Sequence, residues 1–490
     1  MRAPIRDLDQ AEFDVVVIGA GVNGASTAEQ LSAAGYRVLI VDKGDFATGA
    51  SSRSSRLLHC GLRYLAPGRS ILDFARHPSR LNVALRMARL AMQARSELVH
   101  SKAHRTQAIR LHFPIYRGGP YRNWQVDLAF RILGALGPGD VPLDYQRLSP
   151  DEAKSQPLIG GLRDFDQLQG VAAFREYQFH WPERIAIDAV MAAGTTGAVA
   201  RNYTSARLAS HQAGQGWSIE LTDMLDQSAP VTVRGKCALV MAGVWIDDVL
   251  KAGKPAAGRK IFGTKGAHIV VKLPEACRGL GIATLNSLNE PFYCIPWNDL
   301  HYFGPTETEY TGDQDNVHVT EEEMAFLIRE ANRLLPGLRL TPADVQMTWA
   351  GVRPLTYDEA VPFGNRSRVV HDLGHDGLPD AFAMTAGPVM THRSAGAEMT
   401  ALVRSRLAPS QGQARPAATA APAAGEHAER LSDLIFRRSG RGWAGPVPEE
   451  ELACIAAEAG AMLGWDEPRI ARETRSFEEE WARLYRPRLK

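Results

Sequence analysis

Cysteine is scarce in this chain, and long apolar runs are lacking. The 490 residues include only Cys60, Cys237, Cys277, Cys294 and Cys454, and none of these forms a CxxC pair. Such spacing argues against a disulfide scaffold or a cysteine-based metal cluster, and it fits a reducing compartment. The histidines also lack the spacing of a helical metal site, so we expect no metal. The most apolar stretches, 15–18 and 238–246, fall far short of the ~20 residues that cross a bilayer.

An excess of charge of either sign is also missing. Lysine and arginine total 56 against 55 aspartate and glutamate, a formal net charge of +1. No global basic field is therefore available for sequence-independent binding to nucleic acid, and we expect no nucleic-acid partner. The first ten residues are charged and contain no apolar signal core, so we expect a cytoplasmic protein. The apolar share of 45% is enough for a large core and two to four domains.

What the chain does contain is a βαβ unit at its start. Residues 14–18 form a β-branched run, residues 25–34 have helical composition, and residues 37–41 form a second strand candidate. The turn between the first strand and the helix reads GAGVNG, the GxGxxG pattern of dinucleotide-binding folds. The alternative is a glycine turn in an α/β unit that binds nothing.

Each glycine of the GxGxxG pattern has a physical role. Gly19 permits the tight turn, Gly21 allows the backbone to approach a diphosphate, and Gly24 lets the helix pack on the strand. The helix N-terminus adds partial positive charge. Asp42 ends the second strand, where an acid accepts hydrogen bonds from an adenosine ribose. A single fingerprint at the start of the chain favours tightly held FAD over NAD.

Residues 51–65 carry a more specific signal. They read SSRSSRLLHCGLRYL, which resembles the flavin-proximal segment of the FAD-dependent glycerol-3-phosphate dehydrogenases. In that family the segment reads Leu-(Ile/Val)-His-Gly-Gly-Leu-Arg-Tyr-Leu, so only Cys60 departs from it. Further matching segments are 265–271, 295–297, 351–355, Arg368, Arg437-Arg438, 463–465 and Glu473.

The resemblance implies an α/β fold: an FAD-binding Rossmann-type domain interleaved with an antiparallel-sheet substrate domain, plus a small C-terminal helical domain. We expect the FAD-binding parts at about 1–110, 165–260 and 350–407, and the substrate-binding parts at about 111–164 and 261–349. The Ala- and Pro-rich segment 408–428 predicts a linker, because it lacks side chains that could bury a core. Residues 429–490 regain helical periodicity.

The resemblance also implies an activity: hydride transfer from the secondary alcohol of an anionic polyol to the flavin, with quinone as electron acceptor. His268, His59 and Arg353 are the expected catalytic residues, with His268 accepting the hydroxyl proton. Arg63, Arg353 and Arg368 are expected to bind the substrate anion, because a guanidinium presents a planar, permanently charged fork. Tyr64 and His392 complete the expected substrate-binding set. The expected FAD-binding residues are Gly19, Gly21, Asn23, Gly24, Asp42, Ser51, Ser52, Ser55, His59, Gly61, Val199, Gly243, Trp245, Gly387, Pro388, Val389 and Met390.

Departures from the family pattern leave the exact substrate open. Pro388 stands where the family has lysine, which removes a cation and a backbone donor near the flavin. The segment 177–186 lacks the family's Asp-Asp-x-Arg, and Gly-Pro-Thr-Glu at 304–307 replaces Gly-Thr-Thr-Asp. Two other functions stay open: an FAD oxidase of an amine or 2-hydroxy acid, and a flavin-binding protein without turnover.

Partners beyond the substrate are left open as well. Residues 122–136 carry an apolar stripe with two arginines, which suits either core packing or peripheral contact with the inner face of the plasma membrane. A homodimer and an acceptor other than quinone are further alternatives.

Overall fold

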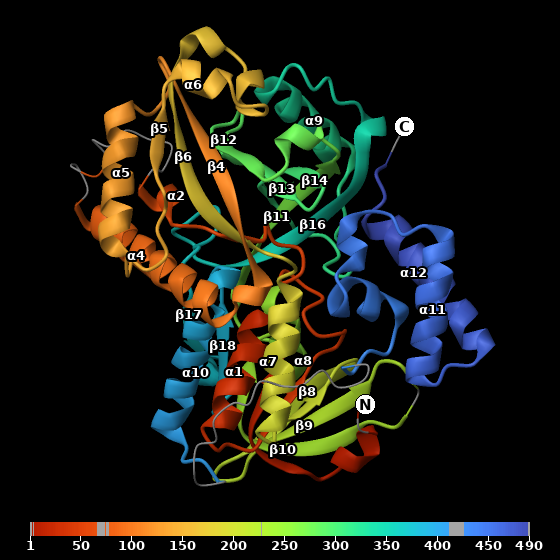
Figure 1. Ribbon diagram of the computed structural model, residues 1–490. Coiled ribbons are helices and arrows are strands. Elements are labelled where there is room, and N and C mark those ends of the chain that lie inside the picture. Colours follow the sequence, from red (N-terminus) through yellow and green to blue (C-terminus); the bar gives the residue numbers. More distant parts are fainter. Residues whose placement is uncertain are drawn as a thin grey trace.

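The computed structural model describes residues 2, 4–65, 74, 78–226, 228–410 and 426–488. Two sheets lie one above the other in Figure 1, with the C-terminal helices beside them. The lower sheet has the strand order β17-β18-β10-β1-β2-β7, and β9 and β8 extend it from β10. Its strands are β1 (Glu12–Ile18), β2 (Val38–Val41), β7 (Val199–Arg201), β8 (Thr204–Gln212), β9 (Gly216–Asp223), β10 (Val231–Val240), β17 (Val369–Asp372) and β18 (Ala381–Thr385).

The core of the lower sheet is parallel, as the predicted βαβ unit requires. β1 pairs in parallel with β2 and β10, β2 with β7, and β10 with β18. Helices α1 (Val22–Ala33), α7 (Glu183–Thr195) and α10 (His392–Arg406) cover one face. The β8–β9–β10 ribbon and α8 (Ile246–Gly253) cover the other. Strands buried on both faces explain the continuous apolar runs in the sequence. The expected Rossmann-type arrangement is confirmed.

The upper sheet is mainly antiparallel, with the order β15-β11-β14-β13-β12-β4-β6-β3; β16 pairs with β11, and β5 with β6. Its strands are β3 (Leu57–Leu58), β4 (Thr106–Tyr116), β5 (Gln146–Leu148), β6 (Leu168–Phe179), β11 (Ile261–Val271), β12 (Leu280–Leu285), β13 (Pro291–Trp297), β14 (Leu300–Gly304), β15 (Thr308–Glu309) and β16 (Val345–Thr356). Its helices are α2 (Leu62–Leu65), α4 (Pro78–Ser101), α5 (Asn123–Leu136), α6 (Pro150–Lys154) and α9 (Glu321–Leu334).

Four strands of the upper sheet, β3, β4, β6 and β16, lie wholly or partly in segments that were expected to bind the cofactor. β4 and β6 pair along their whole length, from Thr106 opposite Phe179 to Tyr116 opposite Leu168. Residues 106–110 and 168–179 therefore belong to the upper sheet, although the sequence placed them in the cofactor-binding part. The pairing partner of a strand is set by tertiary structure, which the apolar pattern of one segment does not report. The division into domains otherwise stays a prediction.

The C-terminal module, residues 426–488, contains η10 (Asp433–Arg438), η11 (Arg441–Ala444), α11 (Glu449–Leu463) and α12 (Glu467–Leu484). Gly464 ends α11 in the left-handed conformation, and the Asp466 carboxylate caps α12 by accepting from the N–H of Arg469. The predicted apolar stripe packs inward at Leu452, Ala456, Phe477 and Leu484, whereas Met462 is exposed. Most of the expected linker, 411–425, lies outside the described residues.

Candidate active site

The glycine turn predicted from the sequence lies between β1 and α1, and two of its glycines are required by close contacts. Gly19 has φ of +107°, and a Cβ on it would lie 2.6 Å from the carbonyl oxygen of Met241. A Cβ on Gly24 would lie 1.9 Å from the carbonyl oxygen of Gly19. Gly21 differs, because its Cβ would meet only Ser51 Oγ, at 3.1 Å. The space above Gly21 is what a bound diphosphate needs.

The N-terminal turn of α1 is open to an anion. Gly21 is the N-cap and has no side chain to accept from the helix, so the N–H groups of the first turn other than that of Val22 can face an anion. Ser51 Oγ accepts from the N–H of Val22 at 3.1 Å, and Asn23 lies in the same turn. Ser52 is engaged within its own turn, donating to the carbonyl oxygens of Gly49 (3.2 Å) and Thr48 (3.4 Å).

Asp42 joins this turn to the end of β2. Its carboxylate accepts from the N–H of Ala20 at 2.7 Å and of Gly44 at 3.0 Å. Burial raises its pKa to about 6, although both hydrogen bonds act against the shift. The carboxylate thus faces the glycine turn, as the ribose-binding role requires.

Three further expected FAD-binding residues lie on neighbouring elements. Val199 begins β7 and lies opposite Leu39 of β2. Gly243 has φ of +57° and opens the short helix η5 (Gly243–Trp245) after β10. The Trp245 ring has the Lys43 ammonium 4.5 Å from its centroid. Gly243 and Trp245 follow the carboxyl end of β10, the side on which ligands of open α/β sheets bind, whereas Val199 lies at the amino end of β7.

A cavity of about 310 Å³ lies between the two sheets. Residues of the loop 50–64, of β4, β6, β11–β13 and β16, and of the turn 386–389 line it. Nine residues expected from the sequence are in the lining: Ser55, His59, Arg63, Tyr64, His268, Arg353, Gly387, Pro388 and Val389. The structure therefore brings together residues that are up to 334 positions apart, from Ser55 to Val389. Gly61 lies just behind the lining, where a Cβ would meet Ala88 Cα of α4 at 3.0 Å.

Positive charge concentrates at this cavity. Arg63, Arg353 and Arg366 all line it. Burial lowers the pKa of Arg353 to about 10, and the charge of Arg63 adds to the shift. Arg353 Nη1 is enclosed without a hydrogen-bond partner among the described residues. A buried donor of this kind needs an acceptor, and a phosphate or carboxylate oxygen supplies one.

Three residues that were expected to contact the substrate or the flavin end of FAD lie outside the cavity lining. Arg368 pairs with Glu398 at 2.8 Å and donates to Ser394 Oγ at 3.1 Å, while Arg366 occupies the cavity wall in its place. His392 is buried and its Nδ1 donates to the carbonyl oxygen of Val389 at 2.9 Å. Met390 packs in an apolar cluster with Leu58 and Phe179. Arg368 and His392, which were expected to bind the substrate, therefore do not line the cavity, and their side chains make other contacts.

Both histidines of the lining are held neutral. His268 Nε2 lies 3.1 Å from Ser55 Oγ, and its ring stacks on Trp349 at 4.8 Å between centroids. Burial, then the charges of Arg353 and Arg56, keep the pKa of His268 well below its usual value. Burial, then the charge of Arg63, lower the pKa of His59 to about 3. Near pH 7 both rings can accept a hydrogen bond, and neither adds charge.

Sequence reasoning missed several charged residues of the lining, namely Arg53, Arg56, Glu176 and Arg366. Arg56 is fully buried, and the only signal for it was its place in the Ser-Ser-Arg repeat. Glu176 is buried on β6, accepts from the N–H of Cys60 at 2.7 Å, and pairs with Arg95 at 3.5 Å. Burial raises the pKa of Glu176 to about 7. Nothing in the segment around Glu176 distinguishes it from a surface carboxylate.

Comparison with known proteins identifies similar chains. The sequence profile of the family described as "FAD dependent oxidoreductase" matches residues 14–393. A glycerol-3-phosphate dehydrogenase of Synechocystis sp. is 30% identical over 461 residues, covering 87% of this chain and 78% of that protein. An aerobic glycerol-3-phosphate dehydrogenase of Staphylococcus aureus is 26% identical over 405 residues, covering 82% and 69%.

Solved structures share the fold. A glycerol-3-phosphate dehydrogenase from Bacillus halodurans, complexed with FAD, aligns with a TM-score of 0.71 at 19% identity over 99% of this chain and 98% of that one. An L-alpha-glycerophosphate oxidase from Mycoplasma pneumoniae, with FAD bound, aligns with a TM-score of 0.60 at 16% identity over 81% and 95%. Both of these structures contain FAD.

Gly24→Ala is expected to abolish FAD retention, because the new Cβ cannot lie 1.9 Å from the Gly19 carbonyl oxygen and the turn must move. Flavin absorbance per protein after gel filtration measures the effect. Gly194→Ala is the matched control: this exposed glycine of α7 has open space around its Cβ, so FAD content should stay at the wild-type level. Full flavin occupancy in Gly24→Ala would contradict the assigned role of the turn.

Proposed function

The chain belongs to the family of FAD-dependent oxidoreductases that includes the glycerol-3-phosphate dehydrogenases, and on that premise we propose that it oxidises glycerol 3-phosphate or a closely similar polyol phosphate. The observation that carries the substrate proposal is the group of guanidinium side chains, Arg63, Arg353 and Arg366, around one cavity. The named activities of the similar proteins support the same class of substrate.

Arg353 and Arg63 bind the phosphate in this proposal, and Arg366 closes the rim. The side chain of Arg366 is 43% exposed and pairs with the carboxylate of Glu307, another lining residue. Gly266 on β11 makes room for Arg353, because a Cβ there would lie 2.4 Å from Arg353 Nη2. The guanidinium is thus held against the sheet with its fork toward the cavity, and charge-assisted hydrogen bonds fix the dianion.

The residues Ser55 and His268 move the hydroxyl proton. Both line the cavity, and Ser55 Oγ lies 3.1 Å from His268 Nε2. The substrate hydroxyl passes its proton to Ser55 Oγ, and the Ser55 proton moves to His268 Nε2. A neutral imidazole of low basicity suffices, because the hydroxyl becomes strongly acidic as the hydride leaves its carbon. Bound FAD supplies the two-electron acceptor for that hydride.

The cofactor is positioned by residues at both ends of the site. The glycine turn, Ser51 and Asp42 are proposed to hold the diphosphate and the ribose, and Gly387, Pro388 and Val389 to lie beside the ring. Pro388 has φ of −71° at the start of η9 (Val389–Thr391), a conformation that proline adopts without strain. The lysine of the family is therefore replaced without disturbing the turn, and Arg353 and Arg366 supply the positive charge in its place.

We also propose that the protein docks on a membrane surface through α5 and delivers electrons to quinone there. Trp124 and Leu128 are 58% and 44% exposed, one turn apart on α5, and the exposed Arg131 follows on the same face. Exposed aromatic and aliphatic residues beside arginine suit an interface with anionic lipid. None of the described helices is both long and apolar enough to cross a bilayer.

Arg353→Met should raise the KM for glycerol 3-phosphate about 10- to 100-fold, the loss expected for a charge-assisted hydrogen bond. FAD content should not change. The assay follows anaerobic bleaching of the flavin, then dye reduction, with hydrogen peroxide measured to detect an oxidase. Arg368→Met is the matched control and should leave KM unchanged, because Arg368 pairs with Glu398. Wild-type flavin that stays oxidised with glycerol 3-phosphate would refute the proposed substrate.

The pH dependence follows from the lowered pKa of His268. The ring must be neutral to accept a proton, so activity is lost as pH falls through that pKa, and the acid limb of kcat/KM should lie well below pH 6.5. Ser55, Tyr302, Trp349, Arg353 and Arg56 face the ring. Removing one positive charge in Arg353→Met raises the pKa, so the limb should move to higher pH. An acid limb that is the same in both enzymes would exclude His268.

Membrane docking is tested with the double variant Trp124→Gln/Leu128→Gln. Removing two apolar side chains from the interface should lower the fraction that sediments with anionic phospholipid vesicles by roughly tenfold. Dye-linked activity should be unchanged. Met462→Gln, which changes another exposed apolar helical residue, should sediment like the wild type. Equal sedimentation of all three proteins would place the docking surface elsewhere or exclude it.

A further inference from the structure

A short segment of the C-terminal module contacts two distant parts of the candidate active site. This segment, residues 437–443, which we call the clasp, runs from the last turn of η10 into η11. At one end Arg437 and Arg438 bind Asp45, which follows β2. At the other end Trp443 packs on Arg56, which lines the cavity. The clasp therefore contacts both the loop that follows Asp42 and the Arg56 side chain in the cavity lining.

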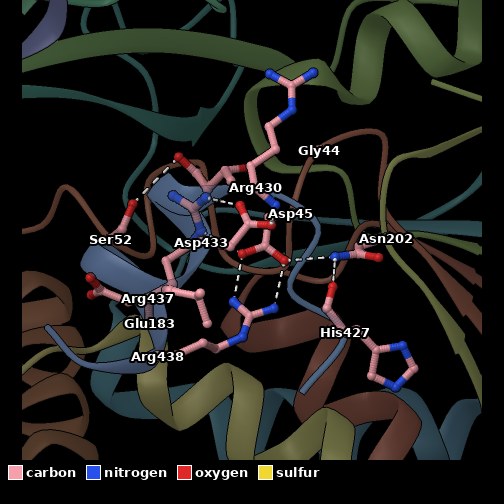
Figure 2. Close-up of polar contacts among 12 residues, drawn as sticks. Gly44, Asp45, Ser52, Glu183, Asn202, His427, Arg430, Asp433, Arg437 and Arg438 are labelled. Atoms are coloured by element: carbon pink, nitrogen blue, oxygen red, sulfur yellow. Dashed lines mark hydrogen bonds and ion pairs between the residues drawn. The ribbon is translucent and has the colours of Figure 1, made fainter. Parts of the chain in front are cut away.

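The contact at Asp45 is a buried ion cluster (Figure 2). The Asp45 carboxylate is fully buried and accepts from Arg437 Nε at 2.6 Å and from Arg438 Nη1 and Nη2 at 2.6 and 2.8 Å. Asn202 Nδ2 donates to it at 2.9 Å. The two guanidinium groups hold the pKa of Asp45 far below its usual value. All four hydrogen bonds that the Asp45 carboxylate accepts come from residues outside its own loop.

A second carboxylate balances the charge of the cluster. Asp433, also fully buried, binds Arg437. It also accepts from Tyr203 Oη at 2.6 Å. Asp45 thus meets the two guanidinium groups across the contact between the module and the lower sheet, whereas Asp433 lies in the module itself and crosses the contact through Tyr203. In such a cluster the loss of one member leaves a buried charge without compensation, so the members hold the two parts together.

Hydrogen bonds connect the loop that contains Asp45 to the predicted ribose site. Asp42, three residues earlier, accepts from the N–H of Gly44, the residue before Asp45. Asp42 also accepts from the N–H of Ala20 in the glycine turn. The loop 42–45 is therefore fixed at one end by the glycine turn and at the other by the clasp.

At its other end the clasp completes a cage around Arg56. The Arg56 guanidinium carbon lies 4.0 Å from the Trp443 ring centroid, 4.6 Å from that of Trp297 and 5.1 Å from that of Trp349. Trp297 Nε1 donates to the carbonyl oxygen of Trp443 at 2.9 Å, and Trp443 Nε1 donates to the Glu183 carboxylate. Trp443 is thus held by hydrogen bonds at both its ring and its backbone.

Arg56 lies in the lining of the cavity, and its strongest electrostatic attraction is to the buried carboxylate of Glu183. Its Nη2 donates to the carbonyl oxygen of Ser52 at 3.3 Å, whereas Nε and Nη1 are buried with no hydrogen-bond partner among the described residues. Within the same parts of the chain it forms no ion pair, and aromatic faces surround it instead. A cation in so dry a site acts strongly on negative charge that develops nearby.

We propose that the clasp makes the C-terminal module a working part of the active site: Asp45, Arg437 and Arg438 position the loop that holds FAD, and Trp443 positions Arg56 as a cation beneath the cavity. Its catalytic part rests on the proposed function, but its cofactor part does not. Asp45, Arg437, Arg438 and Trp443 are positioning residues, because each acts through another group. Arg56 is the group through which they act on the reaction, because reduction of the flavin adds negative charge that a fixed cation stabilises.

The cavity end of the clasp is tested with Trp443→Ala in the full-length holoenzyme. Water then reaches Arg56 and screens its charge, so we expect a lower flavin midpoint potential by spectroelectrochemistry. We also expect a fall in kcat of about tenfold or more, a KM within about threefold of the wild type, and normal FAD content. Trp443→Phe, which keeps an aromatic wall, should restore most of the potential and of kcat. An unchanged potential in Trp443→Ala would overturn this part, whatever the rates.

Arg441→Ala is the matched control for the clasp. Arg441 lies in the same turn as Trp443, but it binds Glu451 and two carbonyl oxygens of the module itself. Its removal should leave FAD content, potential and kcat at wild-type values. A loss equal to that of Trp443→Ala would mean that any damage to the turn has the same effect, and would overturn the proposal.

The Asp45 end is tested by FAD retention, which needs no substrate. Asp45→Asn removes the charge but keeps the shape, and we expect the Kd for FAD to rise about tenfold or more. Arg438→Lys keeps the positive charge but loses the planar fork, so the Kd for FAD should rise less than in Asp45→Asn. This second variant serves as the test if Asp45→Asn proves insoluble. Unchanged FAD affinity in both variants would overturn this part. A wild type that binds FAD but never oxidises glycerol 3-phosphate would instead refute only the proposed substrate.

Discussion

Positive charge held away from water at the junction of the two sheets is the constraint on which the rest of the structure depends. A buried guanidinium stays charged, whereas a buried lysine can become neutral by losing a proton and a buried carboxylate by gaining one. Arg56 is 1% exposed, so the chain must surround it with groups that tolerate a cation. Three tryptophan faces do so, and one of them comes from the C-terminal module. The need to enclose one arginine thus explains why residues more than 380 positions apart along the chain must meet.

The same charges determine what the histidines of the cavity can do. His268 and His59 would be partly protonated in water near pH 6.5, but burial and the nearby arginines keep them neutral. A neutral imidazole does not compete with the arginines for their counter-charge, so the substrate anion is the natural partner of Arg353. In the proposed function the arginines therefore bind the substrate anion, and the Ser55–His268 pair accepts the hydroxyl proton. Glu176 also lines the cavity: one of its oxygens accepts from the N–H of Cys60, and the other lies 3.5 Å from Arg95 Nε without a hydrogen bond among the described residues.

Local features of the site could be predicted from the sequence, whereas features created by pairing between distant segments could not. The glycine turn and Asp42 lie within one βαβ unit, so residue spacing alone placed them correctly opposite one another. Arg366 and Arg368 show the limit: they are two residues apart just before β17, and only the turn of the backbone decides that Arg366 lines the cavity while Arg368 binds Glu398. Pairing of β4 with β6, and of Asp45 with Arg438, depends on contacts across about 50 to about 390 residues, for which one sequence holds no local signal.

Cys60, the one departure within the family segment at 51–65, illustrates how a substitution near the cavity can be chemically silent. The residue is fully buried, and burial together with the neighbouring Glu176 carboxylate raises the pKa of its thiol well above the usual value. The thiolate is the reactive form of cysteine, so this side chain cannot act as a nucleophile toward a flavin or a substrate near pH 7. Its backbone N–H, by contrast, is fully used by Glu176, an interaction that any residue at this position can make. The position therefore requires a small side chain and a backbone donor, and cysteine meets both requirements while leaving the chemistry to the arginines and the Ser55–His268 pair.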